Sequence, residues 1–174
     1  MTDWGAHHFD IAQWGLGMDR NGPVAIYPPD GKDYRVLTYR YANGITMVRD
    51  GKYEGHGGVN GILFIGSKGR VEVNRGHLKT WPESLLKQKI GPNEVHLYDS
   101  NNHYGDFLKS IKTRKPPICD VEIGYSTVAV CHLGNIAYRV KRPLFWDQKK
   151  QVFSKPDPEA ERLLGRTMRA PWHL

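Results

Sequence analysis

The sequence predicts an α+β fold, in which an antiparallel or mixed open-faced β-sheet is covered by helices on one face. Two observations support this prediction. Short segments of β-type alternation, separated by turns, occupy much of the first half of the chain, and helical periodicity begins near residue 100. Strands grouped before helices are typical of α+β proteins. Because a domain has about 150 residues on average, we expect residues 1–174 to form one domain.

The first half is predicted to contain a helix and then several strands. Residues 3–16 fit a helix stopped by glycine, and residues 24–27 fit a short strand. Asn43-Gly44 lies between the alternating segments 34–41 and 45–48, and Asn-Gly in this position is a strong signal for a type I′ hairpin. We expect an exposed apolar sheet face, suited to oligomerisation, that contains Tyr39, Tyr41 and Met47.

The middle of the chain predicts a second hairpin and less regular structure. Residues 50–60 contain four glycines and suggest a loop. Residues 62–65 and 70–73 flank a tight turn and predict two antiparallel strands. A short helix is expected over 82–89 and a strand over 95–98.

Three helices are expected in the second half. Apolar residues at helical spacing predict a helix over 104–111, capped by Asn101 or Asn102. Residues 121–141 predict a longer helix, whose small residues favour burial against a sheet. Short strands follow at 144–146 and 151–153, and Asp157-Pro158 predicts the start of a final helix with the apolar stripe Ala160, Leu163, Leu164 and Met168.

Composition argues against several classes of protein. Lys and Arg number 25 and Asp and Glu 18, which gives a net charge of +7, but the basic residues are spread along the chain. We therefore expect no nucleic-acid partner. No apolar segment approaches the roughly 18–20 residues of a membrane helix, so no membrane partner is expected. Cys119 and Cys131 fit no zinc spacing, and Cys131 is predicted to be a buried free thiol.

A candidate site lies in the first ten residues. Asp3, His7 and Asp10 have i, i+4, i+7 spacing, which places them on one face of a helix. A carboxylate one turn before a histidine can orient the imidazole, so His7 could act as a general acid/base with Asp3 as its partner. Two other interpretations remain open. With His8 these residues could bind a divalent metal, and Asp3 could simply cap the helix.

The segment that contains these residues resembles a motif of the Gfo/Idh/MocA oxidoreductases, which include glucose–fructose oxidoreductase and inositol dehydrogenase. Residues 3–10 are similar to the family's Asp-x-Gly-x-His-x-x-Asp motif. Four further segments resemble a bacterial subgroup of the family, so that the similarity covers essentially the whole chain: Asn102–Leu108, Asp120–Gly124, Cys131–Ala137 and Arg169–Trp172.

The resemblance implies one half of a two-domain enzyme. Family members have an N-terminal Rossmann domain that binds NAD or NADP and a C-terminal domain whose open sheet face builds oligomers. His7 matches the catalytic histidine and Asp3 its partner, whereas Asp10, His8 and His103 are assigned supporting or substrate-side roles. The dinucleotide motif Gly-x-Gly-x-x-Gly and the family's Glu-Lys-Pro are absent from this sequence. We therefore expect residues 1–174 to be the C-terminal domain alone, without the Rossmann domain and with no cofactor or metal of its own.

The resemblance further implies a substrate-binding and oligomerisation domain of an NAD(P)-dependent oxidoreductase that acts on sugars, polyols or sugar derivatives. Redox-neutral, glycosidase-like chemistry remains open. We expect the chain alone to be inactive and to form a homo-oligomer through its sheet face. The alternative is a stand-alone, non-enzymatic module that binds a carbohydrate or a protein. The location is left open, with the cytoplasm as the default, because any export signal would precede the missing domain.

Overall fold

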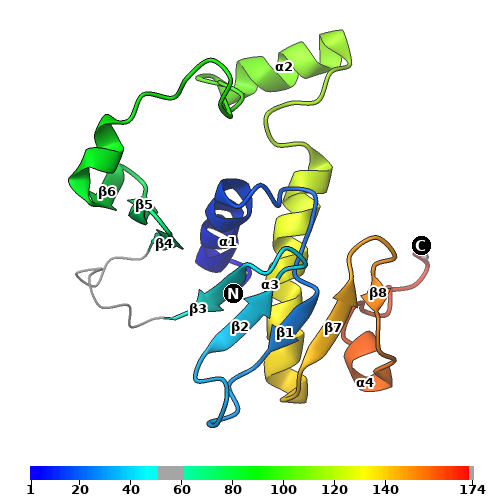
Figure 1. The fold of residues 1–174 in the computed structure, drawn as a ribbon. Helices are drawn as coiled ribbons and strands as arrows, with labels where there is room; N and C mark the ends of the chain where they lie inside the picture. Colours follow the sequence, from blue (N-terminus) through cyan, green and yellow to red (C-terminus); the bar gives the residue numbers. More distant parts are fainter. Residues whose placement is uncertain (51–60, 173–174) are drawn as a thin grey trace. The chain divides into compact units, whose positions relative to one another are not determined.

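The computed structural model describes residues 1–50 and 61–172 (Figure 1). Most of the expected glycine-rich loop, residues 51–60, lies outside these residues. The chain divides into two compact units. Unit 1 consists of Met1–Gly55 and Ser126–Leu174, and unit 2 of His56–Tyr125. Unit 1 contains the candidate site.

Unit 1 is built on a five-stranded sheet with the strand order β3-β2-β1-β7-β8. Every pairing in it is antiparallel. The predicted β2–β3 hairpin is present, but its turn is not type I′, because Gly44 has a positive φ (+86°) and Asn43 does not. The Gly44 N–H instead donates to the Tyr41 carbonyl, and Gly44 supplies the left-handed residue of a longer turn. The strands are β1 (Ala25–Tyr27), β2 (Leu37–Arg40), β3 (Thr46–Arg49), β7 (Leu144–Asp147) and β8 (Val152–Phe153).

Two helices of unit 1 share a core with one face of this sheet. They are α1 (Trp4–Gly15) and the part of α3 (Val121–Val140) that belongs to unit 1. Residues of both helices form one buried cluster with Ile26, Leu37 and Tyr39 of the sheet. The predicted burial of the longer helix is confirmed, since nine of its residues are buried.

The prediction that Tyr39, Tyr41 and Met47 form an exposed face is wrong. Tyr39 and Tyr41 are buried, and Met47 packs against the core. The alternation correctly placed these side chains on one face. A period of two cannot show which face the helices cover, and that choice was the error.

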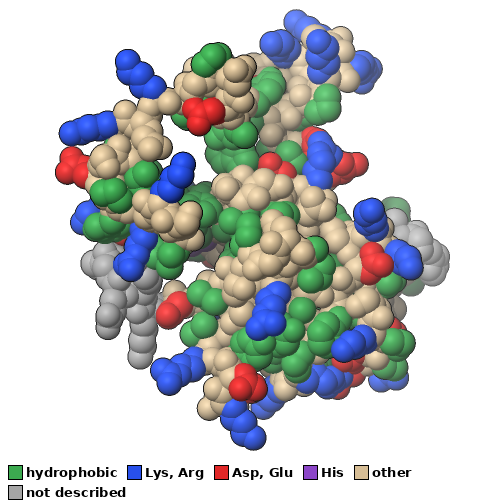
Figure 2. Space-filling model, in the orientation of Figure 1, with side chains coloured by type: hydrophobic (Ala, Val, Ile, Leu, Met, Phe, Trp, Pro, Cys, Tyr) green, Lys and Arg blue, Asp and Glu red, His purple; other side chains and the backbone are tan. Residues whose placement is uncertain are grey.

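The opposite sheet face, which we call the outer face, carries aromatic rings and cations. Tyr27 stacks on Tyr34 with ring centroids 4.4 Å apart, and the Arg40 guanidinium lies over both rings at 5.2 and 5.9 Å from their centroids. The Lys155 ammonium lies 3.7 Å from the centroid of Phe145. Figure 2 shows hydrophobic side chains gathered over β1, β2 and β7, with Lys and Arg side chains among them.

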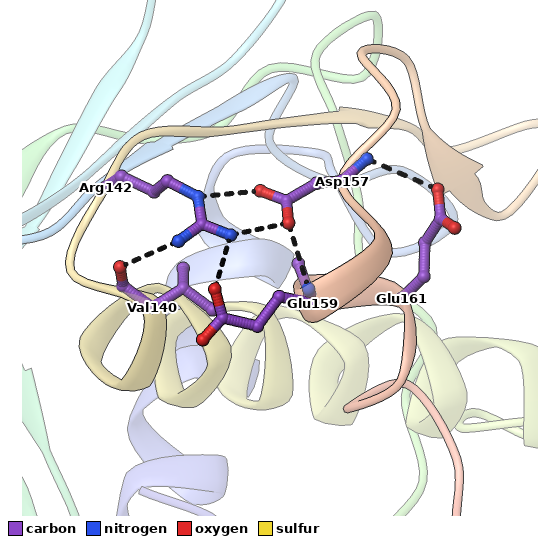
Figure 3. Close-up of polar contacts among 6 residues, drawn as sticks. Val140, Arg142, Asp157, Glu159 and Glu161 are labelled. Atoms are coloured by element: carbon purple, nitrogen blue, oxygen red, sulfur yellow. Dashed lines mark hydrogen bonds and ion pairs between the residues drawn. The ribbon is translucent and has the colours of Figure 1, made fainter.

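The end of α3 and the start of α4 (Pro158–Glu161) are joined by Arg142 (Figure 3). Its Nε and Nη2 donate to the two oxygens of Asp157 at 3.0 and 2.6 Å, and its Nη1 donates to the carbonyl of Val140. Arg142 also pairs with Glu159 at 2.9 Å. Asp157 is the predicted N-cap, because its carboxylate accepts from the Ala160 N–H.

The final helix is shorter than we predicted. α4 ends at Glu161, and the expected apolar stripe continues into residues without helical structure. Ala160 is buried and Leu163 packs against the core, whereas Leu164 and Met168 are exposed. Beyond Leu163 the residues of this stripe are exposed, and most helical stability in proteins comes from packing of an apolar face, which helical spacing alone cannot show.

Unit 2 contains a three-stranded antiparallel sheet of order β4-β5-β6. The β4–β5 hairpin was predicted, whereas β6 was not. The expected helix at 82–89 is a shorter 3₁₀ helix. The elements are β4 (Ile62–Gly66), β5 (Gly69–Asn74), β6 (His77–Trp81), η1 (Glu83–Lys87) and α2 (His103–Thr113).

The strand predicted over 95–98 is absent from unit 2. Tyr98 instead donates its hydroxyl to Asp106 of α2 at 2.6 Å, and the other Asp106 oxygen accepts from the Ile118 N–H. The predicted cap of α2 is confirmed, since Asn102 accepts from the Gly105 N–H. Both sheets are antiparallel, so the α+β prediction is confirmed. No helix in the described ranges is long and apolar enough to span a bilayer.

Candidate functional site

The predicted acid/base pair lies at the start of α1. Asp3 is the N-cap residue, but its side chain makes no capping hydrogen bond. His7 follows one turn later, and both side chains are exposed. Within the described part of the chain, no hydrogen bond joins the Asp3 carboxylate to the His7 imidazole. Both groups are therefore accessible to a ligand, and hydrogen bonds of catalytic groups often tighten only when substrate is bound.

Trp4 lies beside His7 and was not among the predicted site residues. The indole and imidazole centroids are 5.6 Å apart, with the rings tilted by 54°. The i, i+3 spacing of the two residues was the signal that could have found this contact. The outward face of α1 thus presents an aromatic ring next to its imidazole.

Asp10 has a different environment from Asp3 and His7. It is half-buried, and its Oδ1 accepts a hydrogen bond from the Thr127 hydroxyl of α3 at 2.8 Å. Desolvation raises the pKa of the nearby Asp19, and the negative charge of Asp10 raises it further. Asp10 therefore holds α1 against α3 rather than joining His7 on the outward face.

Gln13 is a second anchor of α1 that sequence reasoning missed. Its side chain is fully buried, and its Nε2 donates to the carbonyls of Met18 and Asn21 at 3.0 and 2.8 Å. Its Oε1 accepts from the Tyr41 hydroxyl at 2.5 Å. Because burial raises the pKa of Tyr41, this hydroxyl stays protonated and remains a donor. The anchors on the inner side of α1 fix its orientation, so that Trp4 and His7 face outward.

The other two predicted substrate-side residues, His8 and His103, belong to different units of the chain. His8 is half-buried on α1. His103 is the first residue of α2 in unit 2, where it is exposed and its ring centroid lies 4.2 Å from that of Tyr104. Within the described ranges, no three His, Cys, Asp or Glu side chains form a group that could hold a metal ion. The alternative metal interpretation of the first ten residues therefore has no support from the geometry.

The described residues do not fit a dinucleotide. The dinucleotide-binding fold uses parallel strands with a glycine-rich turn between a strand and a helix. In residues 1–50 and 61–172, every strand pairing is antiparallel. This part of the chain therefore lacks the parallel-strand arrangement by which that fold holds a dinucleotide.

The fold and the site together define an α+β domain that presents an aspartate and a histidine to solvent from one anchored helix. A family model described as "Oxidoreductase family, C-terminal alpha/beta domain", of the Gfo/Idh/MocA type, matches residues 1–174. The chain therefore belongs to this oxidoreductase family and contains its C-terminal domain. No curated protein and no solved structure matches the chain. The bacterial subgroup stays a prediction.

Proposed function

We propose that the outward face of α1 forms the substrate side of an oxidoreductase active site. His7 is the general acid/base for a hydroxyl of a sugar, polyol or sugar derivative, and Asp3 is its partner. The observation that carries the proposal is that both groups are exposed on neighbouring turns of one helix, while the inner face of that helix is anchored in the core. Membership of the oxidoreductase family supports this reaction class.

The proposed chemistry of this chain concerns the proton alone. Oxidation of an alcohol removes a proton from its oxygen, and imidazole is the side chain best suited to accept it near neutral pH. Asp3, one turn away, can accept a hydrogen bond from the imidazolium and stabilise it. His8 and His103 remain proposed substrate-side residues, and Asp10 supports the site through its bond to Thr127.

NAD or NADP, on which the family generally depends, is proposed to bind outside the described residues, because these residues do not fit it. An N-terminal Rossmann domain is the proposed partner for this purpose. Accordingly, we expect residues 1–174 alone to give no turnover.

The first experiment is to sequence the DNA upstream of the Met1 codon and to express any longer in-frame form. Reduction of NAD and NADP is then measured with a panel of sugars and polyols. We expect His7→Gln to lower kcat about 10²- to 10⁴-fold, the usual contribution of a general acid/base. His132→Gln is the matched control, because His132 is an exposed histidine of α3 outside the proposed site, and it should change kcat far less.

Two results would contradict this proposal. Full turnover by His7→Gln would exclude the acid/base role of His7. The alternative, a non-enzymatic carbohydrate- or protein-binding module, instead predicts binding without turnover in every form of the protein. Turnover by residues 1–174 with added NAD or NADP would overturn the proposed location of the cofactor site.

The outer face of the unit 1 sheet is the proposed homo-oligomer interface, in place of the buried residues that we first expected there. Val48 pairs with Thr38 across β2 and β3, so its side chain belongs to the same face as Arg40, and it is 52% exposed. We expect Val48→Asp to reduce the oligomer to monomers in sedimentation velocity without changing the circular dichroism spectrum. An unchanged sedimentation coefficient would place the interface elsewhere.

A further inference from the structure

Trp4 is a large apolar side chain that the acid/base proposal leaves without a role. Its side chain is 60% exposed, although it lies directly beside the proposed catalytic group. The 5.6 Å separation and 54° tilt leave the indole neighbouring the imidazole without covering it. A single exposed tryptophan is ordinary on a protein surface, so its neighbours must decide whether it has a function.

The fold holds this indole in the solvent. α1 is fixed from its inner side by the buried Phe9 and Ala12, by the three hydrogen bonds of Gln13, and by the Asp10–Thr127 bond. Rotating the helix to bury Trp4 would break these contacts. The aromatic face therefore stays on the same side of the helix as His7.

The polar groups around Trp4 match a ligand that has both hydroxyls and C–H bonds. Asp3 precedes it and His7 follows within one turn, and both are exposed hydrogen-bonding groups. The face of an aromatic ring carries partial negative charge, which attracts polarised C–H groups. Ligand sites usually combine such apolar surface with a few placed polar groups.

We propose that Trp4 is a specificity-determining residue, whose indole stacks on the C–H face of a pyranose or other cyclic polyol. Asp3 and His7 then form hydrogen bonds with the hydroxyl groups at the edge of the sugar ring. An open-chain polyol presents no continuous C–H face. The indole face of Trp4, which we call the platform, therefore selects cyclic over open-chain substrates. This inference rests on the proposed function and adds the substrate shape to it.

The test is a titration followed by the indole N–H signals in ¹H–¹⁵N NMR spectra. The protein is the chain of residues 1–174, together with any longer form that its gene encodes. The probes are methyl β-D-glucopyranoside and sorbitol, a cyclic and an open-chain polyol with the same number of carbons in the sugar skeleton. We expect the Trp4 signal to shift with the pyranoside and to respond more weakly to sorbitol.

The variants identify the residue responsible. We expect Trp4→Ala to raise the Kd for the pyranoside about three- to tenfold, as loss of an aromatic contact does, and Trp4→Phe to restore most of the affinity. Trp14→Ala is the matched control, because Trp14 is also exposed on α1 but lies about 15 Å farther along the helix at 1.5 Å per residue. It should leave the Kd unchanged.

The outcomes separate this inference from the proposed function. Absence of pyranoside binding, equal binding of both probes, or an equal effect of Trp4→Ala and Trp14→Ala would overturn the platform. If His7→Gln abolishes turnover while Trp4→Ala leaves the preference for cyclic substrates intact, the proposed function stands and the platform is wrong. If His7→Gln retains turnover while Trp4→Ala weakens pyranoside binding, the acid/base role is wrong and the platform stands.

Discussion

At Gly134 the backbone of α3 packs closely against side chains of the sheet, and replacing this glycine with alanine should be strongly destabilising. A Cβ at this position would overlap the Tyr39 hydroxyl and lie 2.9 Å from Cδ2 of Leu37 and 2.8 Å from Cε of Met1. The Met1 methyl group is the end of a flexible side chain and can move. Tyr39 and Leu37 are fully buried, so they cannot move without disturbing the core.

The expected magnitude follows from two opposing terms. Alanine gains about 1 kcal/mol over glycine in a helix interior. Overpacking a core costs about 1–3 kcal/mol, and overlap with two rigid side chains favours the upper end of that range. Gly134→Ala should therefore lower the free energy of unfolding by about 2 kcal/mol.

The partner variant is Tyr39→Phe, which removes the overlapping oxygen. In the described part of the chain, the buried Tyr39 hydroxyl has no hydrogen-bond partner, and an unsatisfied buried group costs about 1–3 kcal/mol. Tyr39→Phe alone should therefore be at least as stable as the wild type. In its background, the cost of Gly134→Ala should fall below about 1 kcal/mol, because the overlap is gone.

The assay is urea unfolding of the four proteins of this double-mutant cycle. Gly124→Ala serves as the control on the same helix, since a Cβ there would meet no atom of the described residues within 4 Å, and it should not destabilise the protein. If Gly134→Ala costs as much in the Tyr39→Phe background as in the wild type, the hydroxyl overlap is not the cause and the argument fails.

Three further predictions concern stability and reactivity. Thr127→Val should lower the free energy of unfolding by about 1.5–3 kcal/mol, because it removes a hydrogen bond to the Asp10 carboxylate, and Thr127→Ser should restore most of the loss in the same urea assay. Hydrogen bonds from Arg142 lower the pKa of the Asp157 carboxyl group in the folded protein. The ionised carboxylate therefore stabilises the fold above its unfolded pKa of about 3.9, and this contribution disappears as the pH falls through the lower pKa of the folded protein. The stability difference between wild type and Asp157→Asn should therefore be constant near pH 7 and vanish in strong acid, and a difference that persists there would contradict the assignment. Burial raises the pKa of the Cys131 thiol to about 11, so Ellman's reagent at pH 8 should react rapidly with the exposed Cys119 alone and with a second thiol only after denaturation.

The elements that the sequence predicted well are those with strong local signals. The Asn43-Gly44 hairpin, the Asn102 cap and the Asp157-Pro158 helix start all appear in the structure. Each depends on a turn or cap that a few neighbouring residues determine. Cys131 is a free, buried thiol, as predicted from its apolar helical surroundings.

The errors concern properties that depend on distant contacts. The buried face of β2 was assigned incorrectly, because the position of α1 and α3 decides which face is covered. The supporting role of Asp10 stays a prediction, but its hydrogen-bond partner Thr127 lies far away in the sequence and could not be predicted. The same holds for Gln13, which bonds to Tyr41. Spacing within α1 could place Asp3 and His7 on adjacent turns, but it could not reveal what anchors the inner side of the helix.

The pairing of β1 with β7 has a consequence for how this chain tolerates insertions, deletions and proteolytic cleavage. β1 to β3 come from the first segment of unit 1, and β7 and β8 come from its last segment. The pairing of β1 with β7 therefore brings together the two ends of the long chain segment between them, which contains unit 2. The entropy of closing such a segment grows only logarithmically, by about 0.6 kcal/mol for each doubling of its length. Insertions or deletions within unit 2 should therefore change the stability of unit 1 little. A proteolytic cut in the same segment should leave two fragments that remain associated through β1, β7 and their shared core.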